Sequence, residues 1–205
     1  MYDQVTEFIR QRVTVPEDAL QEAFSRSRMV HYKKGDIILR AGEYCRFIGF
    51  LNTGLIMVTV TDEAGKEAVC SFFFEKEFFT YVEGIQENIP SDKNFVALED
   101  CQLLLLSKNE LPAIFSLHPA FEALFNKVIL EGLRRVIGYA QAQHTLSVEE
   151  RYLHLMERQP ELFSRIPLKV IANYLGVAPP ASAACEKDWR RREKLTEVKS
   201  RLTGR

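Results

Sequence analysis

The sequence predicts an α+β protein, in which an antiparallel β-roll is followed by a long helix and a C-terminal helix-turn-helix. Three observations predict this fold class. Apolar residues recur in short strand-like runs between residues 29 and 107, whereas the flanking segments follow the helical spacing of three and four. One apolar helical stripe then extends over residues 121–143. Residues 168–179 have the pattern of the first helix and turn of a helix-turn-helix, a unit that usually docks on DNA.

Length and composition favour one large or two small domains, because 205 residues with 46% hydrophobic content can build a proper core. The first ten residues contain two acids and no apolar core segment, so they do not predict a secretory signal. No run reaches the ~18 apolar residues of a membrane span, and we expect a cytoplasmic protein without membrane contact. The last 20 residues carry eight Lys or Arg against four Asp or Glu, which fits either DNA contact or a solvated tail.

The β-prone region follows an N-terminal helical segment that is interrupted by Pro16 and ends near Arg28. Its strand-like runs cover residues 30–32, 36–40, 46–51, 54–61, 68–74, 94–98 and 101–106. Turn signals rich in Gly, Asp and Asn separate them. Seven or eight short strands at this spacing favour a closed or rolled antiparallel structure.

A short helix is expected at residues 111–115, and a helix of about 25 residues after Pro119. The broad stripe of the long helix must be covered, and Gly132 within it costs roughly 1 kcal/mol of helix propensity unless two helices cross closely there. We therefore expect a homodimer, with packing on the chain's own β-domain as the alternative. The expected dimer stripe consists of Phe121, Phe125, Val128, Gly132, Val136 and Tyr139.

Two further helices are expected before the C-terminal tail. The first covers about residues 148–159 and stops at Pro160, and the second follows Pro167. In the second helix, Ile171 shares a face with Leu175, four residues later. The second helix should end at Gly176, because glycine suits the left-handed conformation that closes a helix.

No catalytic or metal site is predicted. The cysteines stand far apart, at positions 45, 70, 101 and 185, and no two histidines form an H-x-x-x-H pair. This favours reduced thiols over disulfides, zinc or an iron–sulfur cluster. Glu83, Glu87 and Asp92 are expected in a loop, where solvated acids are ordinary. We therefore expect a protein that is not an enzyme and has no resident cofactor.

The order of these parts resembles the Crp/Fnr family of bacterial transcription regulators. The resemblance covers roughly residues 30–179 and depends on Gly35, Gly42, Gly54 and Gly65, the Phe-Leu-Asn-Thr-Gly phrase at 50–54, the hairpin at 62–67, the long helix and the helix-turn-helix. It implies a cyclic-nucleotide-binding-like β-roll with flanking helices in residues 1–116, a dimerisation helix in 117–145 and a DNA-binding domain in 146–205. The partners it implies are double-stranded DNA, a second copy of the chain and, as a further candidate, RNA polymerase.

The sequence departs from the family's cyclic AMP cassette. In members that bind cyclic AMP, a Gly-Glu pair holds the ribose and an Arg followed by a hydroxyl residue holds the phosphate, whereas this chain has Thr80-Tyr81 and Ser91-Asp92 there. Asp92 would repel a phosphate, and Lys93 would point to the opposite face of a strand. We expect no tight binding of cyclic AMP. An unidentified effector is expected to contact Phe79, Thr80, Tyr81, Ser91 and Lys93, although a phenylalanine-packed core is the alternative role for the rings.

A second departure lies in the recognition helix. Ala184 stands where the family has an Arg that grips guanine, and Ser182 and Cys185 replace buried apolar residues. Three explanations are open: a diverged helix, weak or partner-assisted DNA binding, and a shift of reading frame near Pro179. The DNA contacts that we expect are Lys169, Ser182, Lys187, Arg190, Arg191, Arg192 and Lys194.

The leading hypothesis is an effector-responsive, DNA-binding transcription regulator that does not respond to cyclic AMP. The alternative is a ligand-sensing or protein-interaction dimer whose DNA-binding half is degenerate.

Overall fold

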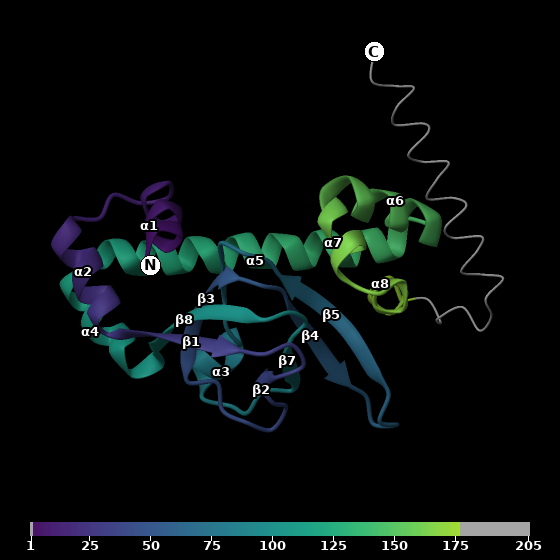
Figure 1. Ribbon diagram of the computed structural model, residues 1–205, viewed down its shortest axis with the longest axis horizontal. Helices are drawn as coiled ribbons and strands as arrows, with labels where there is room; N and C mark the ends of the chain where they lie inside the picture. Colours follow the sequence, from purple (N-terminus) through teal and green to yellow (C-terminus); the bar gives the residue numbers. More distant parts are fainter. Residues whose placement is uncertain (1, 177–205) are drawn as a thin grey trace, which may run out of the picture. The chain divides into compact units, whose positions relative to one another are not determined.

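The computed structural model describes residues 2–176, which form two compact units. The first unit extends to Ser147 and holds the β-strands with their helices, and the second begins at Val148 and is helical. Figure 1 shows the order of the elements along the chain. Within the described range, no helix has both the length and the apolar character that crossing a membrane requires. The residues after Gly176, and with them the expected recognition helix, lie outside this range.

Two four-stranded antiparallel sheets form the β-roll, as the sequence predicted. One sheet has the order β1 (Ser27–Tyr32), β8 (Cys101–Ser107), β3 (Phe47–Thr53), β6 (Glu77–Phe79). The other has the order β2 (Ile37–Leu39), β7 (Lys93–Ala97), β4 (Ile56–Thr61), β5 (Glu67–Phe73). Strand β1 begins at Ser27, earlier than expected. The sequence missed the three-residue β6, which shows no alternation of apolar and polar residues.

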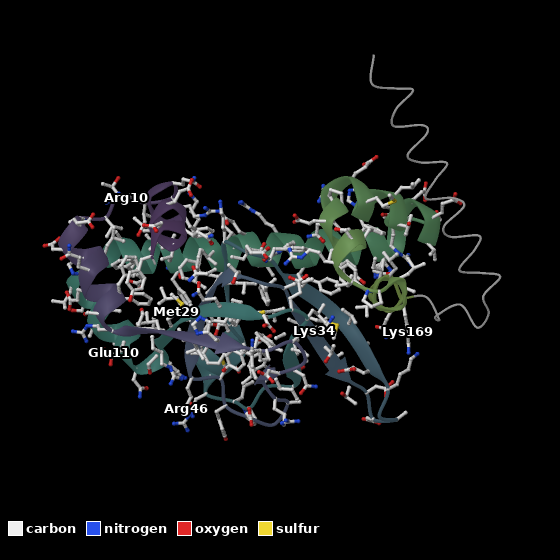
Figure 2. All side chains as sticks on the ribbon, viewed as in Figure 1. Arg10, Met29, Lys34, Arg46, Glu110 and Lys169 are labelled. Atoms are coloured by element: carbon white, nitrogen blue, oxygen red, sulfur yellow. The ribbon has the colours of Figure 1, made fainter. Side chains whose placement is uncertain are left out.

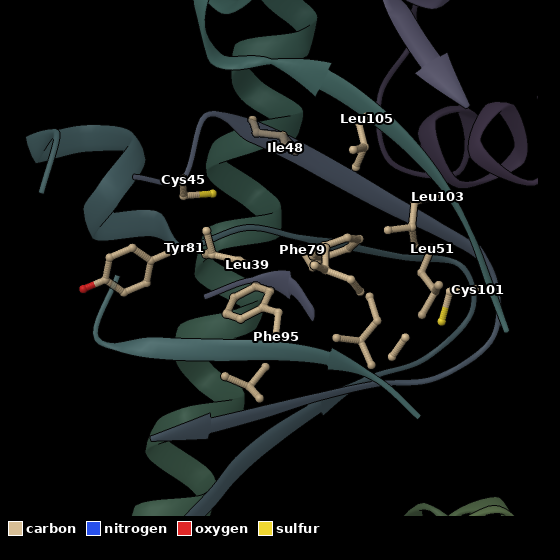
Figure 3. Packing of buried hydrophobic residues seen from close by; sticks show 14 of the residues in the cluster. Leu39, Cys45, Ile48, Leu51, Phe79, Tyr81, Phe95, Cys101, Leu103 and Leu105 are labelled. Atoms are coloured by element: carbon tan, nitrogen blue, oxygen red, sulfur yellow. The ribbon is translucent and has the colours of Figure 1, made fainter. Parts of the chain in front are cut away.

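The inner faces of the two sheets meet in one hydrophobic core (Figure 3). Phe95 enters it from β7, and Leu103 and Leu105 enter it from β8. Leu104, between these leucines, is buried in a second core, on the other face of the strand. Strand β8 is therefore covered on both faces, which explains its unbroken run of leucines.

Helices form the second core on the outer face of the β1–β8–β3–β6 sheet. Helices α1 (Asp3–Arg10) and α2 (Glu17–Ser25) bury Ile9 and Leu20 there, against Phe50 of β3 and Phe121 of the long helix. A single apolar stripe on each short helix is enough to attach it to the roll. The predicted N-terminal helical segment is thus confirmed as two helices.

The long helix is confirmed as α5 (Pro119–Thr145), which follows η1 (Lys108–Glu110) and α4 (Leu111–Leu117). It buries Phe121 and Leu124, both near its start. Farther along, the side chains of Leu133 and Val136 are 51% and 64% exposed. The β-roll and its N-terminal helices therefore cover only the first part of the apolar stripe.

The second unit contains α6 (Val148–Arg158), α7 (Pro160–Arg165) and α8 (Leu168–Tyr174). Pro160 ends α6 as predicted, but it also begins α7, which the sequence missed, because proline fits the first turn of a new helix. Leu162 and Ile171 are buried in this unit. Gly176 has a φ of +72°, the left-handed conformation predicted for it.

Candidate functional site

The candidate site is the segment of residues 79–93, from the last residue of β6 to the first residue of β7, which we call the cassette. At its start, the Thr80 hydroxyl donates to the Phe47 carbonyl at 2.8 Å. At its end, the Ser91 N–H donates to the Glu43 carbonyl at 2.8 Å, and the Gly42 N–H donates to the Ser91 carbonyl at 2.7 Å. The cassette is therefore tied at its start to the first residue of β3 and at its end to the loop that leads into β3.

The middle of the cassette is a short helix, α3 (Val82–Glu87), where the sequence analysis expected a loop for Glu83 and Glu87. The expectation was wrong because six residues are too few to establish a helical period. Asn88 ends the helix in the left-handed conformation, with a φ of +56°. Asp92 does lie outside regular structure, as expected.

Lys108 and Gly84 are two residues of the site that the sequence analysis missed. The Lys108 ammonium donates to the Gly84 carbonyl at 3.2 Å and to the Asn88 Oδ1 at 3.5 Å, so η1 is bonded to the end of α3. A Cβ on Gly84 would lie 2.6 Å from Cδ1 of Tyr81, and only glycine permits this approach. No local pattern identifies Lys108, because its partners lie about 20 residues away.

Phe79 and Tyr81, at the start of the cassette, face the core. Phe79 is 2% exposed, and its ring centroid lies 5.7 to 6.2 Å from those of Phe47, Phe73 and Phe95. Tyr81 is 6% exposed and lies at the edge of the cluster, with its hydroxyl directed away from Leu39 and Phe79 (Figure 3). Phe79 therefore belongs to the packed core, the alternative role considered for the rings.

Ser91, Asp92 and Lys93 form a tight turn at the end of the cassette. The Ser91 hydroxyl donates to the Lys93 carbonyl at 2.9 Å and accepts from the Lys93 N–H at 3.1 Å. The Lys93 ammonium lies 2.8 Å from the Asp92 carboxylate and 5.0 Å from the centroid of the Tyr81 ring. The expectation that Asp92 and Lys93 point to opposite faces was wrong, because Asp92 precedes β7 and strand alternation does not apply to it.

This cassette, between the sixth and seventh strands of an eight-stranded roll, can be compared with known proteins. Residues 29–118 match the cyclic nucleotide-binding domain family. The matched range contains nearly all of the β-roll, the cassette and α4. The search of curated proteins finds no match to the chain.

Solved structures of bacterial proteins share the fold. The regulator CLP from Xanthomonas campestris, described as c-di-GMP responsive, has a TM-score of 0.66 at 19% identity, over 89% of this chain and 93% of that one. FixK2 from Bradyrhizobium japonicum has a TM-score of 0.68 at 14% identity, over 82% and 86%. A transcriptional regulator of the Crp/Fnr family from Eubacterium rectale has a TM-score of 0.66 at 15% identity, over 80% and 79%. At these identities the likeness shows the fold.

The charges in the cassette of this β-roll are already paired. Hydrogen bonding to Lys93 lowers the pKa of Asp92, against the opposing effect of its partial burial. Burial is the largest single influence on Lys93 and acts against its charged form, but the hydrogen bond to Asp92 and the nearby negative charges together outweigh it, and the pKa of Lys93 is raised. Burial, followed by the nearby Asp92 charge, raises the pKa of Tyr81. At neutral pH the cassette thus holds a carboxylate, an ammonium and a neutral phenol.

The other expected site residues are distributed over the chain. Lys169 lies on α8 with an exposed side chain (Figure 2), and the other expected DNA contacts lie after residue 176, outside the described range. On α5, Phe125 packs against Phe115 of α4, with ring centroids 5.8 Å apart. Gly132 has open space around it: nothing lies within 4 Å of a Cβ placed there. Among the described residues, no three His, Cys, Asp or Glu side chains cluster to hold a metal ion.

Proposed function

We propose that the chain is a transcription regulator of the Crp/Fnr type, with a β-roll sensor, a dimerisation helix and a DNA-binding C-terminal part. The observation that carries the proposal is the order of its parts: a cyclic nucleotide-binding domain, a 27-residue helix, and a helical unit in which α8 ends at a left-handed glycine. Structural likeness to CLP, FixK2 and the Eubacterium rectale regulator supports it. In this proposal the three functions divide at residues 1–116, 117–145 and 146–205.

The sensor is proposed not to respond to cyclic AMP. A cyclic phosphate needs a cation or several N–H donors that converge on it. In the cassette, the Lys93 ammonium is bonded to Asp92, and the Ser91 hydroxyl is bonded to the Lys93 backbone. Ser91 is also 3% exposed, so its hydroxyl faces protein rather than solvent. An anionic ligand would have to displace Asp92 before it could use Lys93.

The dimer is proposed to form through exposed apolar residues of α5, which share only Val136 with the stripe expected from the sequence. Leu130, Leu133, Val136 and Ile137 are large apolar side chains between 46% and 64% exposed on one helix. Large apolar side chains gathered in this way mark an interaction surface. Gly132 lies among them and leaves room for the close approach of a second helix.

DNA binding tests the proposal. The full chain should bind fragments selected from a random double-stranded library, and the affinity should fall steeply between about 50 and 200 mM salt because bound counterions are released. Lys169→Ala, which removes an exposed cation from α8, should weaken binding of all fragments, whereas Lys76→Ala in the β-roll should not. Absence of any DNA binding at low salt would contradict the proposal.

A second function is a dimeric ligand or protein sensor without DNA binding, favoured by the sequence after Pro179, where Ala184 replaces the guanine-reading Arg. Self-association and ligand-induced stabilisation, without DNA affinity, would support it. Reading the gene in its other two frames distinguishes a diverged recognition helix from a shift of reading frame. A Ser-Arg-containing helix in another frame would show that the reading frame shifts near Pro179.

A further inference from the structure

Lys93 places its ammonium against a carboxylate and an aromatic ring of the cassette. Its ammonium lies 2.8 Å from a carboxylate oxygen of Asp92 and 5.0 Å from the centroid of the Tyr81 ring. The Glu83 carboxylate adds a further favourable charge interaction with Lys93. A carboxylate together with an aromatic face is an arrangement that binds ammonium groups. Here the ammonium comes from the chain itself.

The backbone of the turn positions this pair, in which the Asp92 side chain is 60% exposed and the Lys93 side chain is the more buried partner. The turn through Ser91 is closed by two hydrogen bonds between its hydroxyl and the Lys93 backbone, and it places adjacent residues 92 and 93 on the same side. The Tyr81 ring packs against Gly84, so closely that a Cβ on residue 84 would clash with it. This packing holds the ring in place. The Lys93 side chain is only 29% exposed. The contact of the Lys93 ammonium with Tyr81 and Asp92 therefore connects the start of the cassette to its end.

We propose that Lys93 is an internal ligand of the cassette: its ammonium, held by Asp92 and the face of Tyr81, keeps residues 80–92 folded when no effector is bound. The inference deepens the proposed function and rests on it, since it gives the resting state of the proposed sensor. The contact of Lys93 with Asp92 and Tyr81 also sets the ligand specificity of the site. A ligand with a negative charge must compete with Asp92 for Lys93, whereas a ligand with an ammonium group must displace Lys93 from Asp92 and Tyr81.

Hydrogen–deuterium exchange of the full chain tests this inference. The protein is first unfolded and refolded, which removes any small molecule carried over from the cell. In the wild type, the peptide spanning residues 80–92 should exchange slowly without added ligand. Lys93→Met keeps the aliphatic stem over Tyr81 and removes the charge, and it should speed exchange of this peptide roughly tenfold. Lys93→Arg keeps the charge and should stay within about twofold of the wild type.

Lys33→Met is the matched control. Lys33 forms a comparable pair with Asp100 at 2.7 Å, but outside the cassette and with the side chains 80% and 63% exposed. It should leave the exchange of residues 80–92 unchanged. The inference is overturned if Lys93→Met exchanges like the wild type and Lys33→Met. It is also overturned if the refolded wild-type peptide exchanges as fast as an unfolded one, a measurement that requires no variant to fold. Neither result depends on DNA binding, so failure here is distinct from failure of the proposed function.

Discussion

Gly49 of β3 lies directly opposite Phe79 of β6, and the Phe79 ring covers the place where a side chain at residue 49 would stand. A Cβ on Gly49 would lie 2.4 Å from Cζ of Phe79, far inside van der Waals contact. Phe79 is 2% exposed and packs against three other rings, so it has no free space into which to move. The absence of a side chain at residue 49 therefore fixes the ring that begins the cassette.

Gly49→Ala should lower the free energy of unfolding of the β-roll by about 1–3 kcal/mol, the usual cost of overpacking a core. Chemical denaturation of the two proteins measures the difference. In the double variant Gly49→Ala/Phe79→Leu, the combined cost should be smaller than the sum of the separate costs, because the smaller leucine relieves the clash. Full additivity of the two changes would show that the ring and the glycine do not interact.

Glu22 of α2 should make stability depend on pH. Its carboxylate lies 3.1 Å from the His118 Nε2 and 3.0 Å from an Arg26 guanidinium nitrogen, and these bonds lower its pKa from the ordinary 4.5. A depressed pKa stabilises the fold above the unfolded-state value, and this contribution disappears as the pH falls through the folded-state value. Glu22→Gln should therefore melt at a lower temperature than the wild type at pH 7, and the difference should shrink below pH 4.5 and vanish once the pH has fallen through the folded-state pKa of Glu22.

Glu17→Gln on the same helix is the control for this effect. Glu17 pairs with Arg10, but both side chains are more than half exposed, at 63% and 56%. Exposed pairs contribute little to stability. Thermal scans should therefore show a smaller effect for Glu17→Gln than for Glu22→Gln at pH 7. Equal effects would mean that the contact between Glu22 and His118 contributes no more to stability than an exposed ion pair does.

Val136→Glu should prevent self-association without unfolding the chain. Val136 is 64% exposed on α5, so a charge there costs little in the single chain but would be buried between two helices. Sedimentation equilibrium should show dimers for the wild type and single chains for the variant. Leu117→Glu, at an apolar position on α4 that is 57% exposed, should remain dimeric. An unchanged dimer in Val136→Glu would remove α5 from the interface.

Gly132→Ala separates the two roles of the long helix. In a helix that is solvated at this point, alanine should stabilise by roughly 1 kcal/mol relative to glycine, and the space around Gly132 admits it. In a dimer whose helices cross closely at Gly132, the added methyl group should weaken association. Stability and association should therefore change in opposite directions, as measured by melting at low protein concentration and by sedimentation. A variant that associates as tightly as the wild type would place the crossing elsewhere.

Cyclic AMP should not stabilise the protein. A ligand at 100 times its dissociation constant adds about 2.7 kcal/mol, which for a chain of this size raises the melting temperature by about 5–10 °C. About 1 mM cyclic AMP would produce that shift if it bound with a dissociation constant near 10 μM. We expect no measurable shift, because Asp92 keeps Lys93 from the phosphate. A shift of several degrees would overturn this prediction.

Elements with a long or regular pattern were predictable from the sequence. The alternating strands, the two N-terminal helices and α5 all repeat their apolar residues often enough to reveal a period. The three-residue β6 and the six-residue α3 and α7 do not. Two of these missed elements, β6 and α3, begin and build the cassette. The candidate site therefore lies between two predicted strands, whereas its internal structure was not predicted.

The order of residues was sufficient to predict where strands and helices alternate and that the roll is antiparallel. It also predicts that the cassette lacks the residues with which Crp/Fnr members bind cyclic AMP. These properties are local: they follow from the order of apolar and polar residues and from single side chains. Only the tertiary structure decided that Lys93 turns toward Asp92 and Tyr81, that Lys108 holds the end of α3, and that Phe79 fills the core over Gly49. Those contacts depend on turn geometry and on strands brought together from distant parts of the chain, and no periodic pattern encodes them.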